Sequence, residues 1–239
     1  MASMQDPGPA GPQLPLSLRT APDQRFDAYV AAPAGLLEQL QATAAGESED
    51  WLYLVGAPGT GKTHLLLASC AAADAAGRRA AYLPLQAAAG RLRDALVALE
   101  GNALIALDGL EHIAGDRDDE VALFDAHNRL RAAGSTLLYA AVDAPDALAI
   151  DLPDLRSRLS QCTRLVLAPL DEADRRELLR QRAERRGLVI EDAALDWLLR
   201  RVGRDLGGLT SLLDRLDRAS LAAKRRVTVP FLRALLAAD

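Results

Sequence analysis

Residues 56–63 read GAPGTGKT, and the spacing of their glycines, lysine and threonine is that of a loop that binds phosphate groups. The glycines allow successive backbone N–H groups to point into one concavity, and the N-terminus of a following helix adds positive potential there. Lys62 can reach the terminal phosphates of a nucleotide, and the Thr63 hydroxyl is suited to ligate Mg²⁺. The alternative is a glycine-rich turn that binds nothing. The residues expected to bind nucleotide in this segment are Gly56, Ala57, Pro58, Gly59, Thr60, Gly61, Lys62, Thr63 and His64.

The elements around this loop are those that such a loop requires. The apolar run at 51–55 predicts a buried strand, and residues 64–71 predict a helix. Further strands are expected at 80–83, 103–107, 136–141 and 164–167, and further helices at 34–43, 90–99, 119–133 and 152–159. Strands that alternate with helices predict a parallel sheet with helices on both faces. Ligands of such a sheet bind at the carboxyl ends of its strands.

Three acidic residues follow predicted strands and are therefore candidates for the same site. Asp108 ends the strand at 103–107 and is expected to hold Mg²⁺ through water. Many P-loop ATPases carry a glutamate directly after this aspartate to orient the attacking water, but here that position is Gly109. Either Glu111 takes this role or the group is absent and hydrolysis is slow. Asp143 is placed to sense the terminal phosphate, although an aspartate before Pro145 is also a common way to begin a turn.

A pair of arginines lies on the helix expected at 152–159, which reads LPDLRSRL and begins with a proline in its first turn. Arg156 and Arg158 cannot easily reach the phosphate loop of their own chain, but they can reach that of a neighbour. An arginine supplied in trans stabilises the charge of a phosphoryl-transfer transition state and contributes about 10³–10⁵ in rate. The alternative is a solvated basic helix.

Composition excludes several classes of protein. The chain has 239 residues, 50% of them apolar, which is enough for one large core and a smaller domain. A net charge of −5 argues against a protein that mainly coats nucleic acid. Cys70 and Cys162 form neither a disulfide framework nor a metal-binding pattern. With no secretory leader and no apolar run that could span a bilayer, we expect a cytoplasmic protein that does not contact a membrane.

The chain is expected to have three parts. A disordered tail occupies residues 1–22, a nucleotide-binding domain 23–169, and a helical lid 170–239. The lid is predicted from helical patterns at 171–186, 192–201, 206–223 and 228–238. Within the tail, the sequence QLPLSL is extended around its proline and could dock into an apolar groove of a partner, or pack on its own domain. The residues that would make this contact are Gln13, Leu14, Leu16 and Leu18.

Two aromatic residues precede the first helix. Phe26 and Tyr29 lie where a segment often covers the adenine ring in P-loop ATPases of this layout, and ordinary core packing is the alternative for each ring. The three histidines, His64, His112 and His127, lack the spacing of metal ligands and are expected to be structural.

Four segments together resemble the Hda family of bacterial replication regulators, which are shortened relatives of the initiator DnaA. The segments are QLPLSL, the phosphate loop, LPDLRSRL and LDRLDRASLAAKRRVTVPFLRALL, and the likeness extends from Gln13 to nearly the end of the chain. The resemblance implies an α/β AAA+ fold, a three-layer parallel-sheet domain with a small all-helical C-terminal lid. It also implies that ADP or ATP with Mg²⁺ is bound, and that a homodimer can form.

The same resemblance implies the partners and the activity. In that family the glutamine–leucine peptide binds the sliding clamp of DNA polymerase III. The arginine at the position of Arg158 promotes hydrolysis of ATP held by DnaA, and this negative regulation prevents over-initiation of chromosome replication. The chain ends where DnaA would add its helix-turn-helix, so sequence-specific DNA binding is not expected.

Three departures bear on these expectations. The peptide reads QLPLSL rather than the usual QLSLPL order, and Gly207 stands where relatives place a sensor arginine. With Gly109 after Asp108 as well, weak or no ATPase activity of its own is expected. Two alternative functions are also compatible with the sequence. One is a self-hydrolysing AAA+ ATPase such as a DnaC-like helicase loader, and the other is a DNA-binding scaffold that uses the lid arginines.

Overall fold

The structure is a computed structural model that describes residues 24–202 and 227–236. Its centre is a sheet of five parallel strands in the order β2-β3-β4-β1-β5. The strands are β1 (Leu52–Val55), β2 (Ala80–Pro84), β3 (Leu104–Asp108), β4 (Thr136–Ala141) and β5 (Thr163–Val166). All five strands were predicted within a residue or two. The three inner strands, β4, β1 and β3, are buried along almost their whole length, as expected of parallel strands covered on both faces, whereas the outer strands β2 and β5 are more exposed.

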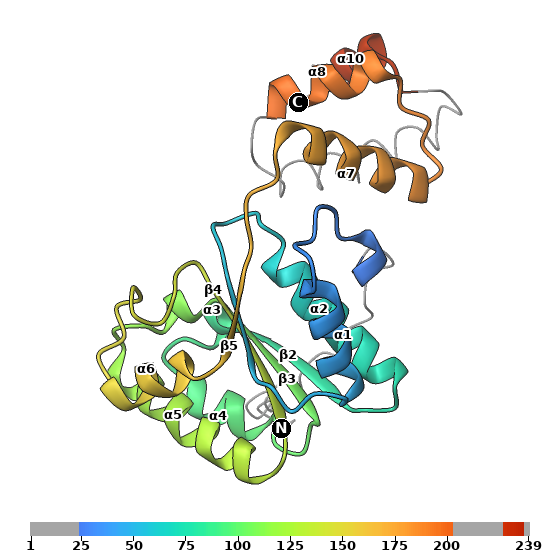
Figure 1. The fold of residues 1–239 in the computed structure, drawn as a ribbon. Helices are drawn as coiled ribbons and strands as arrows, with labels where there is room; N and C mark the ends of the chain where they lie inside the picture. Colours follow the sequence, from blue (N-terminus) through green and yellow to red (C-terminus); the bar gives the residue numbers. More distant parts are fainter. Residues whose placement is uncertain (1–23, 203–226, 237–239) are drawn as a thin grey trace, which may run out of the picture.

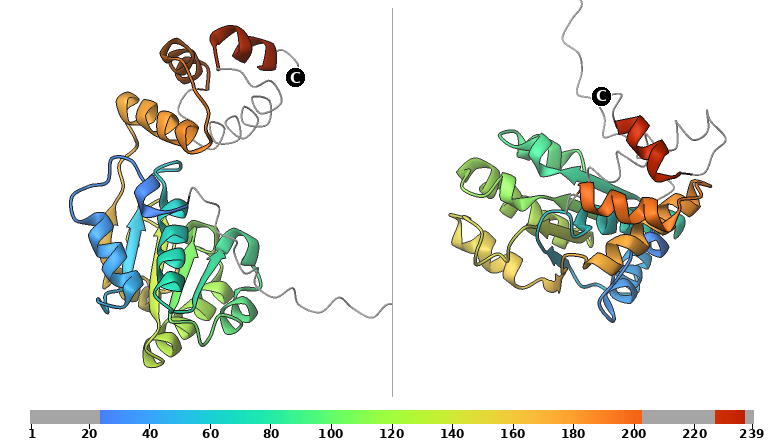
Figure 2. Two further views of the ribbon diagram at one scale, coloured as in Figure 1. Left: turned by 90° about the vertical axis from the view of Figure 1, so that its right-hand side faces the viewer. Right: turned by 90° about the horizontal axis from the view of Figure 1, so that it is seen from above.

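Helices cover both faces of the sheet (Figures 1 and 2), and each face has its own hydrophobic cluster. One face is packed by α1 (Leu36–Ala45) and α2 (Lys62–Ala75). The other is packed by α3 (Leu85–Ala88), α4 (Leu92–Val97), α5 (Arg117–Ala132) and α6 (Pro153–Ser160). Along β4, Leu137 and Tyr139 belong to the second cluster and Leu138 and Ala140 to the first, as the alternation of side chains along a strand requires.

The helix expected at 90–99 is present as α4, which is two residues shorter at each end, whereas the short helix α3 before it was not predicted. The two helices are separated by a break at Gly90, whose φ is 76°. The buried carboxylate of Asp119 causes this break, because it accepts the N–H groups of Gly90 at 2.6 Å and of Leu92 at 3.2 Å. Those two N–H groups are therefore satisfied without a continuous helix.

Helix α5 packs against the sheet along one face. Val121 and Phe124 are only partly buried, whereas Leu123, Ala126 and Leu130 are fully buried. The helix begins at Arg117, two residues earlier than predicted, with Asp116 as its N-cap. Its rotation is set by the carboxylates of residues 119 and 120, which must face the loop N–H groups that they bind.

The lid follows β5 directly and contains α7 (Glu172–Arg185), α8 (Asp192–Val202) and α10 (Val229–Leu236). Its own small core includes Leu179, Leu195 and Leu232. One contact to the sheet domain is the hydrogen bond from Arg185 Nη2 to the carbonyl oxygen of Asp27, at 2.6 Å, in the short 3₁₀ helix η1 (Phe26–Ala28). None of the described helices is both long and apolar enough to cross a membrane.

Two predictions concern segments outside the described residues. The tail at 1–22, with the peptide residues Gln13, Leu14, Leu16 and Leu18, lies there, and so does the helix expected at 206–223 with Gly207. The last strand, β5, ends at Val166 and α7 begins at Glu172, and a domain boundary near residue 170 stays a prediction.

Candidate functional site

The loop at 56–63 connects the carboxyl end of β1 to the first turn of α2, as the motif predicts. Gly59 and Gly61 have φ values of 81° and 90°, which side-chain-bearing residues rarely adopt. A Cβ atom on Gly56 would lie 2.6 Å from the carbonyl oxygen of Leu167, and one on Gly61 would lie 2.6 Å from the ring of Tyr29. The loop therefore needs glycine for its backbone angles and for the close approach of its neighbours.

Lys62 is the cation of this loop and is only 8% exposed. Its Nζ donates hydrogen bonds to the carbonyl oxygens of Gly56 at 2.5 Å and Ala57 at 3.1 Å, so the ammonium group lies against the loop itself. Burial lowers the pKa of Lys62, and the carboxylates of Glu111 and Asp108 oppose this shift. The two carbonyl oxygens that accept from this ammonium group are neutral. A bound phosphate group would supply the negative charge that they lack.

The structure brings Thr63 and Asp108 together at the carboxyl ends of the strands. Thr63 Oγ1 donates a 2.6 Å hydrogen bond to Oδ2 of Asp108. A hydroxyl and a carboxylate at this separation are the oxygen ligands that Mg²⁺ prefers, directly or through water. Among the described residues, three or more His, Cys, Asp or Glu side chains do not gather anywhere as a metal cluster. The donor set therefore fits a magnesium ion that takes its remaining ligands from phosphate oxygens and water.

Tyr82 is a member of this site that sequence reasoning missed. Its hydroxyl donates a 2.8 Å hydrogen bond to the same Oδ2 of Asp108 that Thr63 contacts. Burial and the Asp108 carboxylate raise the pKa of Tyr82, so the hydroxyl keeps its proton and remains a donor. The only sequence signal is the place of Tyr82 near the end of a strand, and its meaning depends on β2 lying next to β3.

Glu111 lies close to this group, although it does not directly follow Asp108. Gly109 turns the chain with a φ of 88°, and the 3₁₀ helix η2 (Leu110–His112) follows. Glu111 Oε2 accepts the backbone N–H of Val142 at 3.2 Å, which fixes the carboxylate beside the end of β4. Its charge raises the pKa of Lys62, so it is near enough to influence the phosphate loop electrostatically.

Asp143 lies at the same edge, after β4, but its carboxylate is exposed. The hydrogen bond that fixes this position is made by its backbone, since Tyr53 Oη donates to the carbonyl oxygen of Asp143 at 2.8 Å. Sensing of a terminal phosphate by the Asp143 side chain remains a prediction.

The segment before α1 contacts the loop through Tyr29 rather than Phe26. Tyr29 Oη donates to the carbonyl oxygen of Thr60 at 2.9 Å, and His64 Nε2 lies 2.9 Å from the carbonyl oxygen of Arg25. Phe26 is 8% exposed and belongs to the hydrophobic cluster of α1 and α2. Phe26 therefore packs in the core, whereas Tyr29 positions the loop backbone.

Arg158 lies at the opposite end of the strands, near their amino ends. It occupies the last turn of α6, just before β5 begins, whereas the phosphate loop follows the end of β1. Because β1 and β5 are parallel neighbours, these two positions are at different ends of the strands. Arg158 forms no ion pair with any residue in the described part of the chain. The structure thus separates this arginine from the phosphate loop of its own chain, as expected.

Comparison with known proteins adds a family and several solved structures. Residues 171–236 match the model of the family described as "Hda, lid domain". Domain III of the replication initiation protein DnaA from Thermotoga maritima is 20% identical, with a TM-score of 0.75, over 92% of this chain and 98% of that one. DnaA from Aquifex aeolicus, solved with AMPPCP, is 19% identical with a TM-score of 0.65, over 80% of this chain and 64% of that one.

A further similar structure is the RuvB Holliday junction branch migration motor of Thermotoga maritima. It is 18% identical, with a TM-score of 0.64, over 90% of this chain and 72% of that one. At these identities the structural matches establish the fold. They confirm the predicted fold class, a parallel α/β sheet domain followed by a small helical lid.

Proposed function

We propose that this chain, an AAA+ protein with a lid domain of the Hda type, is a regulator that promotes hydrolysis of DnaA-bound ATP. The observation that carries this proposal is the position of Arg158. It lies at the sheet edge opposite the phosphate loop, with no acidic partner among the described residues. Such an arginine is placed for a nucleotide bound to another protein rather than for its own.

Arg158 would act on the transferring phosphoryl group. In phosphoryl transfer, negative charge spreads over the equatorial oxygens, and a positioned cation lowers the barrier without any covalent step. The planar guanidinium can donate to two oxygens at once, which a lysine cannot do. The chain therefore needs no catalytic base of its own to increase the hydrolysis rate of its partner.

The phosphate loop would hold ADP or ATP with Mg²⁺ and so fix the conformation that presents Arg158. The proposal is supported by the glycine-dependent loop, the buried Lys62 and the Thr63–Asp108 pair. The similar DnaA from Aquifex aeolicus is described as AMPPCP-bound. Gly109 directly after Asp108 favours slow turnover, so the loop would serve binding more than hydrolysis.

One observation favours a second candidate, a self-hydrolysing ATPase. The carboxylate of Glu111 is fixed near Lys62 by the N–H of Val142, so it could orient an attacking water. Steady-state ATP turnover of the purified chain separates the two candidates. Rapid turnover that Glu111→Gln abolishes would favour the ATPase, and slow turnover in both proteins would favour the regulator.

Clamp binding is the remaining part of the proposal and rests on the tail sequence. Gln13 would enter a polar pocket of the sliding clamp, and Leu14, Leu16 and Leu18 an apolar groove. Replacing Gln13, Leu16 and Leu18 with alanine should eliminate retention on immobilised clamp while leaving ADP affinity unchanged. Equal retention of both proteins would show that the tail has another role.

The direct test of the regulator proposal is a reconstituted assay. DnaA loaded with labelled ATP is mixed with clamp-loaded DNA and with the full-length chain, and the conversion of bound ATP to ADP is followed. The proposal predicts hydrolysis that depends on the added chain and on the clamp. A DnaA hydrolysis rate unchanged by the chain at saturating concentration would contradict the proposed function.

A further inference from the structure

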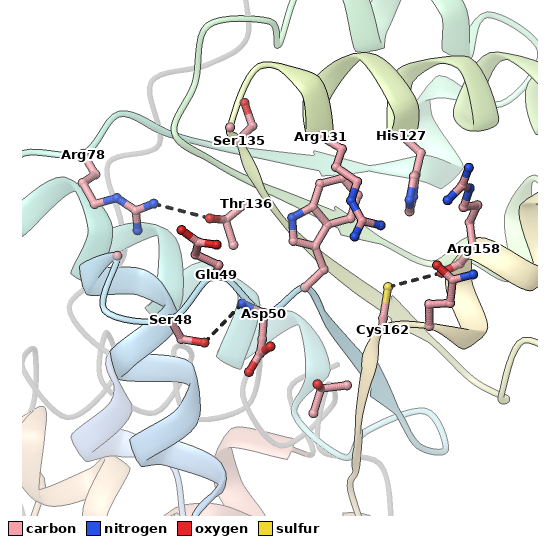
Figure 3. Close-up of a pocket in the computed structure, with 15 residues that line it drawn as sticks. Ser48, Glu49, Asp50, Arg78, His127, Arg131, Ser135, Thr136, Arg158 and Cys162 are labelled. Carbon is pink, nitrogen blue, oxygen red and sulfur yellow. Dashed lines mark hydrogen bonds between the residues drawn. The ribbon is translucent and has the colours of Figure 1, made fainter.

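A cavity of about 550 Å³ opens at the amino-terminal edge of the sheet, away from the phosphate loop. It forms where the chain enters three adjacent strands, since Trp51 precedes β1, Ser135 precedes β4 and Cys162 precedes β5. Arg131 from the last turn of α5 and Arg158 from the last turn of α6 also line it (Figure 3). The cavity thus brings together residues from four separate parts of the chain, within 46–51, at Arg78, within 127–136 and within 158–163.

The charges around this cavity are unevenly placed. In Figure 3, Arg131 and Arg158 lie at the end that also holds His127, whereas Glu49 and Asp50 lie toward Arg78. The guanidinium of Arg78 is already bound, because it donates to two backbone carbonyls of α1 at 2.8 and 2.7 Å. Neither Arg131 nor Arg158 forms an ion pair with a described residue. Two guanidinium groups therefore face one end of the cavity without a neutralising carboxylate.

His127 adds a third polar group at this end and is only 1% exposed. Its Nδ1 lies 3.0 Å from the hydroxyl of Tyr139, and its Nε2 has no hydrogen-bond partner among the described residues. Trp51 packs edge-on against the imidazole, with ring centroids 4.5 Å apart. A buried polar atom without a partner is costly unless a ligand or water satisfies it. A group that binds here can therefore gain a hydrogen bond that the chain itself does not supply.

The electrostatics of His127 agree with this arrangement. Burial lowers its pKa to about 4, and the positive charges of Arg158 and Arg131 act in the same direction. The imidazole is therefore neutral at neutral pH. When the Tyr139 hydroxyl donates to Nδ1, the proton of the neutral ring is on Nε2, which is then a buried donor without a partner among the described residues.

We propose that this end of the cavity binds a phosphate oxyanion, held by the guanidinium groups of Arg131 and Arg158 and by Nε2 of His127. Two planar guanidinium forks match the oxygens of a phosphate, and a neutral N–H donor completes the site without adding charge. Trp51 supports the arrangement, because the guanidinium carbon of Arg131 lies 6.0 Å from the centroid of its ring.

Two sources can supply such a phosphate. The first is the terminal phosphate of a nucleotide held by a partner, which rests on the function proposed above and makes Arg131 a second trans-acting arginine beside Arg158. The second is a free polyphosphate that binds without any partner. Both sources require the same three groups, so the binding site can be tested apart from the regulator activity.

The test uses the full-length chain with Trp197→Phe and Lys62→Ala. The first change leaves Trp51 as the one tryptophan, and the second suppresses binding at the phosphate loop. Titration with inorganic tripolyphosphate should give a saturable change in Trp51 fluorescence. It should also raise the pKa of His127 measured by NMR, because a bound anion stabilises the imidazolium.

Arg131→Gln should weaken tripolyphosphate binding at least tenfold. The matched control is Arg129→Gln, which removes the same charge from the same helix at a residue that pairs with Glu100 at 2.9 Å. Binding that is lost in Arg131→Gln and retained in Arg129→Gln supports the site. The absence of a saturable response, or an equal loss in both variants, overturns it. The assay contains no DnaA, so this failure is distinct from failure of the regulator proposal.

A second measurement identifies the source of the phosphate. If stimulation of DnaA hydrolysis falls at least tenfold in Arg131→Gln and not in Arg129→Gln, the site receives the nucleotide of the partner. If Arg131→Gln loses tripolyphosphate binding but keeps full stimulation, the site exists and its ligand is a free polyphosphate.

Discussion

Lys62 is nearly buried, and among the described residues its ammonium group donates hydrogen bonds to two neutral carbonyls, those of Gly56 and Ala57. We predict that Lys62→Ala weakens ADP binding about 10- to 100-fold, since a charge-assisted hydrogen bond contributes about 1.5–3 kcal/mol. The variant should fold normally, because it removes a partly desolvated charge. Calorimetric titration with ADP measures the first effect and thermal unfolding the second. An unchanged ADP affinity would show that the loop does not bind phosphate.

His127 should make stability sensitive to acid. Its pKa is about 4 in the folded chain, against 6.5 for an ordinary histidine, so above pH 6.5 both states are neutral and the full stability is present. As the pH falls from 6.5 toward 4, the unfolded chain binds a proton that the folded chain does not. The free energy of unfolding should therefore decrease by about 2–3 kcal/mol through this one group.

Urea unfolding at pH 7 and pH 4.5 measures this decrease. His127→Phe keeps an aromatic ring against Trp51 and removes the titrating group, so the loss of stability between the two pH values should be smaller in the variant by about the same 2–3 kcal/mol. Carboxylates contribute to the pH dependence of both proteins and cancel in the difference. Identical pH profiles would mean that His127 titrates normally.

Among the helices, α5 connects several loops of the sheet domain through two buried carboxylates, those of Asp119 and Glu120. Glu120 accepts the N–H groups of Gly115 at 2.9 Å, Asp151 at 2.9 Å and Leu152 at 2.7 Å. The last of these belongs to the N-cap of α6, the helix that carries Arg158. Glu120 thus fixes where α6 begins, and through it the position of the arginine at its other end.

We predict that Glu120→Gln lowers the free energy of unfolding by about 1–3 kcal/mol, because the amide group of glutamine cannot accept all three N–H groups and leaves a buried donor unsatisfied. The control is Asp118→Asn, an exposed change in the first turn of the same helix. Urea unfolding of the three proteins gives the comparison. Equal stability of Glu120→Gln and the unmodified chain would contradict the connecting role.

The sequence predicted the elements whose signal is local. Continuous apolar runs marked the strands, and the phosphate loop lies between β1 and α2 as expected. The break at Gly90 was missed, because it depends on a carboxylate that lies 29 residues further along the chain. Tyr82 was missed for a related reason, since its bond to Asp108 exists only because β2 and β3 are neighbours. Contacts between distant segments leave no signal in the hydrophobic periodicity of either segment.

At the scale of the whole molecule, the parallel sheet separates two kinds of chemistry. The carboxyl ends of its strands carry the phosphate loop, Thr63 and Asp108, and the lid follows on that side after β5. The amino-terminal edge carries Arg158 and the arginine-lined cavity. A protein that binds one nucleotide at the carboxyl ends of its strands can thus present an arginine at their amino ends to a second nucleotide. This arrangement suits a regulator of a partner ATPase.

The proposed regulation depends on Arg158 acting in trans on ATP bound to DnaA, and a comparison of Arg158→Ala with Arg156→Ala tests this role. Arg156 is exposed, on the same helix, and roughly 200° around its axis at 3.6 residues per turn. The measurement is the initial rate of hydrolysis of DnaA-bound ATP, with clamp-loaded DNA and saturating chain.

We predict that Arg158→Ala reduces the stimulated rate by about 10³-fold or more, with ADP affinity and clamp retention unchanged. Arg158→Lys should restore little of the rate, because it lacks the planar fork, and Arg156→Ala should stay close to the unmodified chain. Stimulation by Arg158→Ala equal to that of the unmodified chain would show that Arg158 does not act on the nucleotide of DnaA.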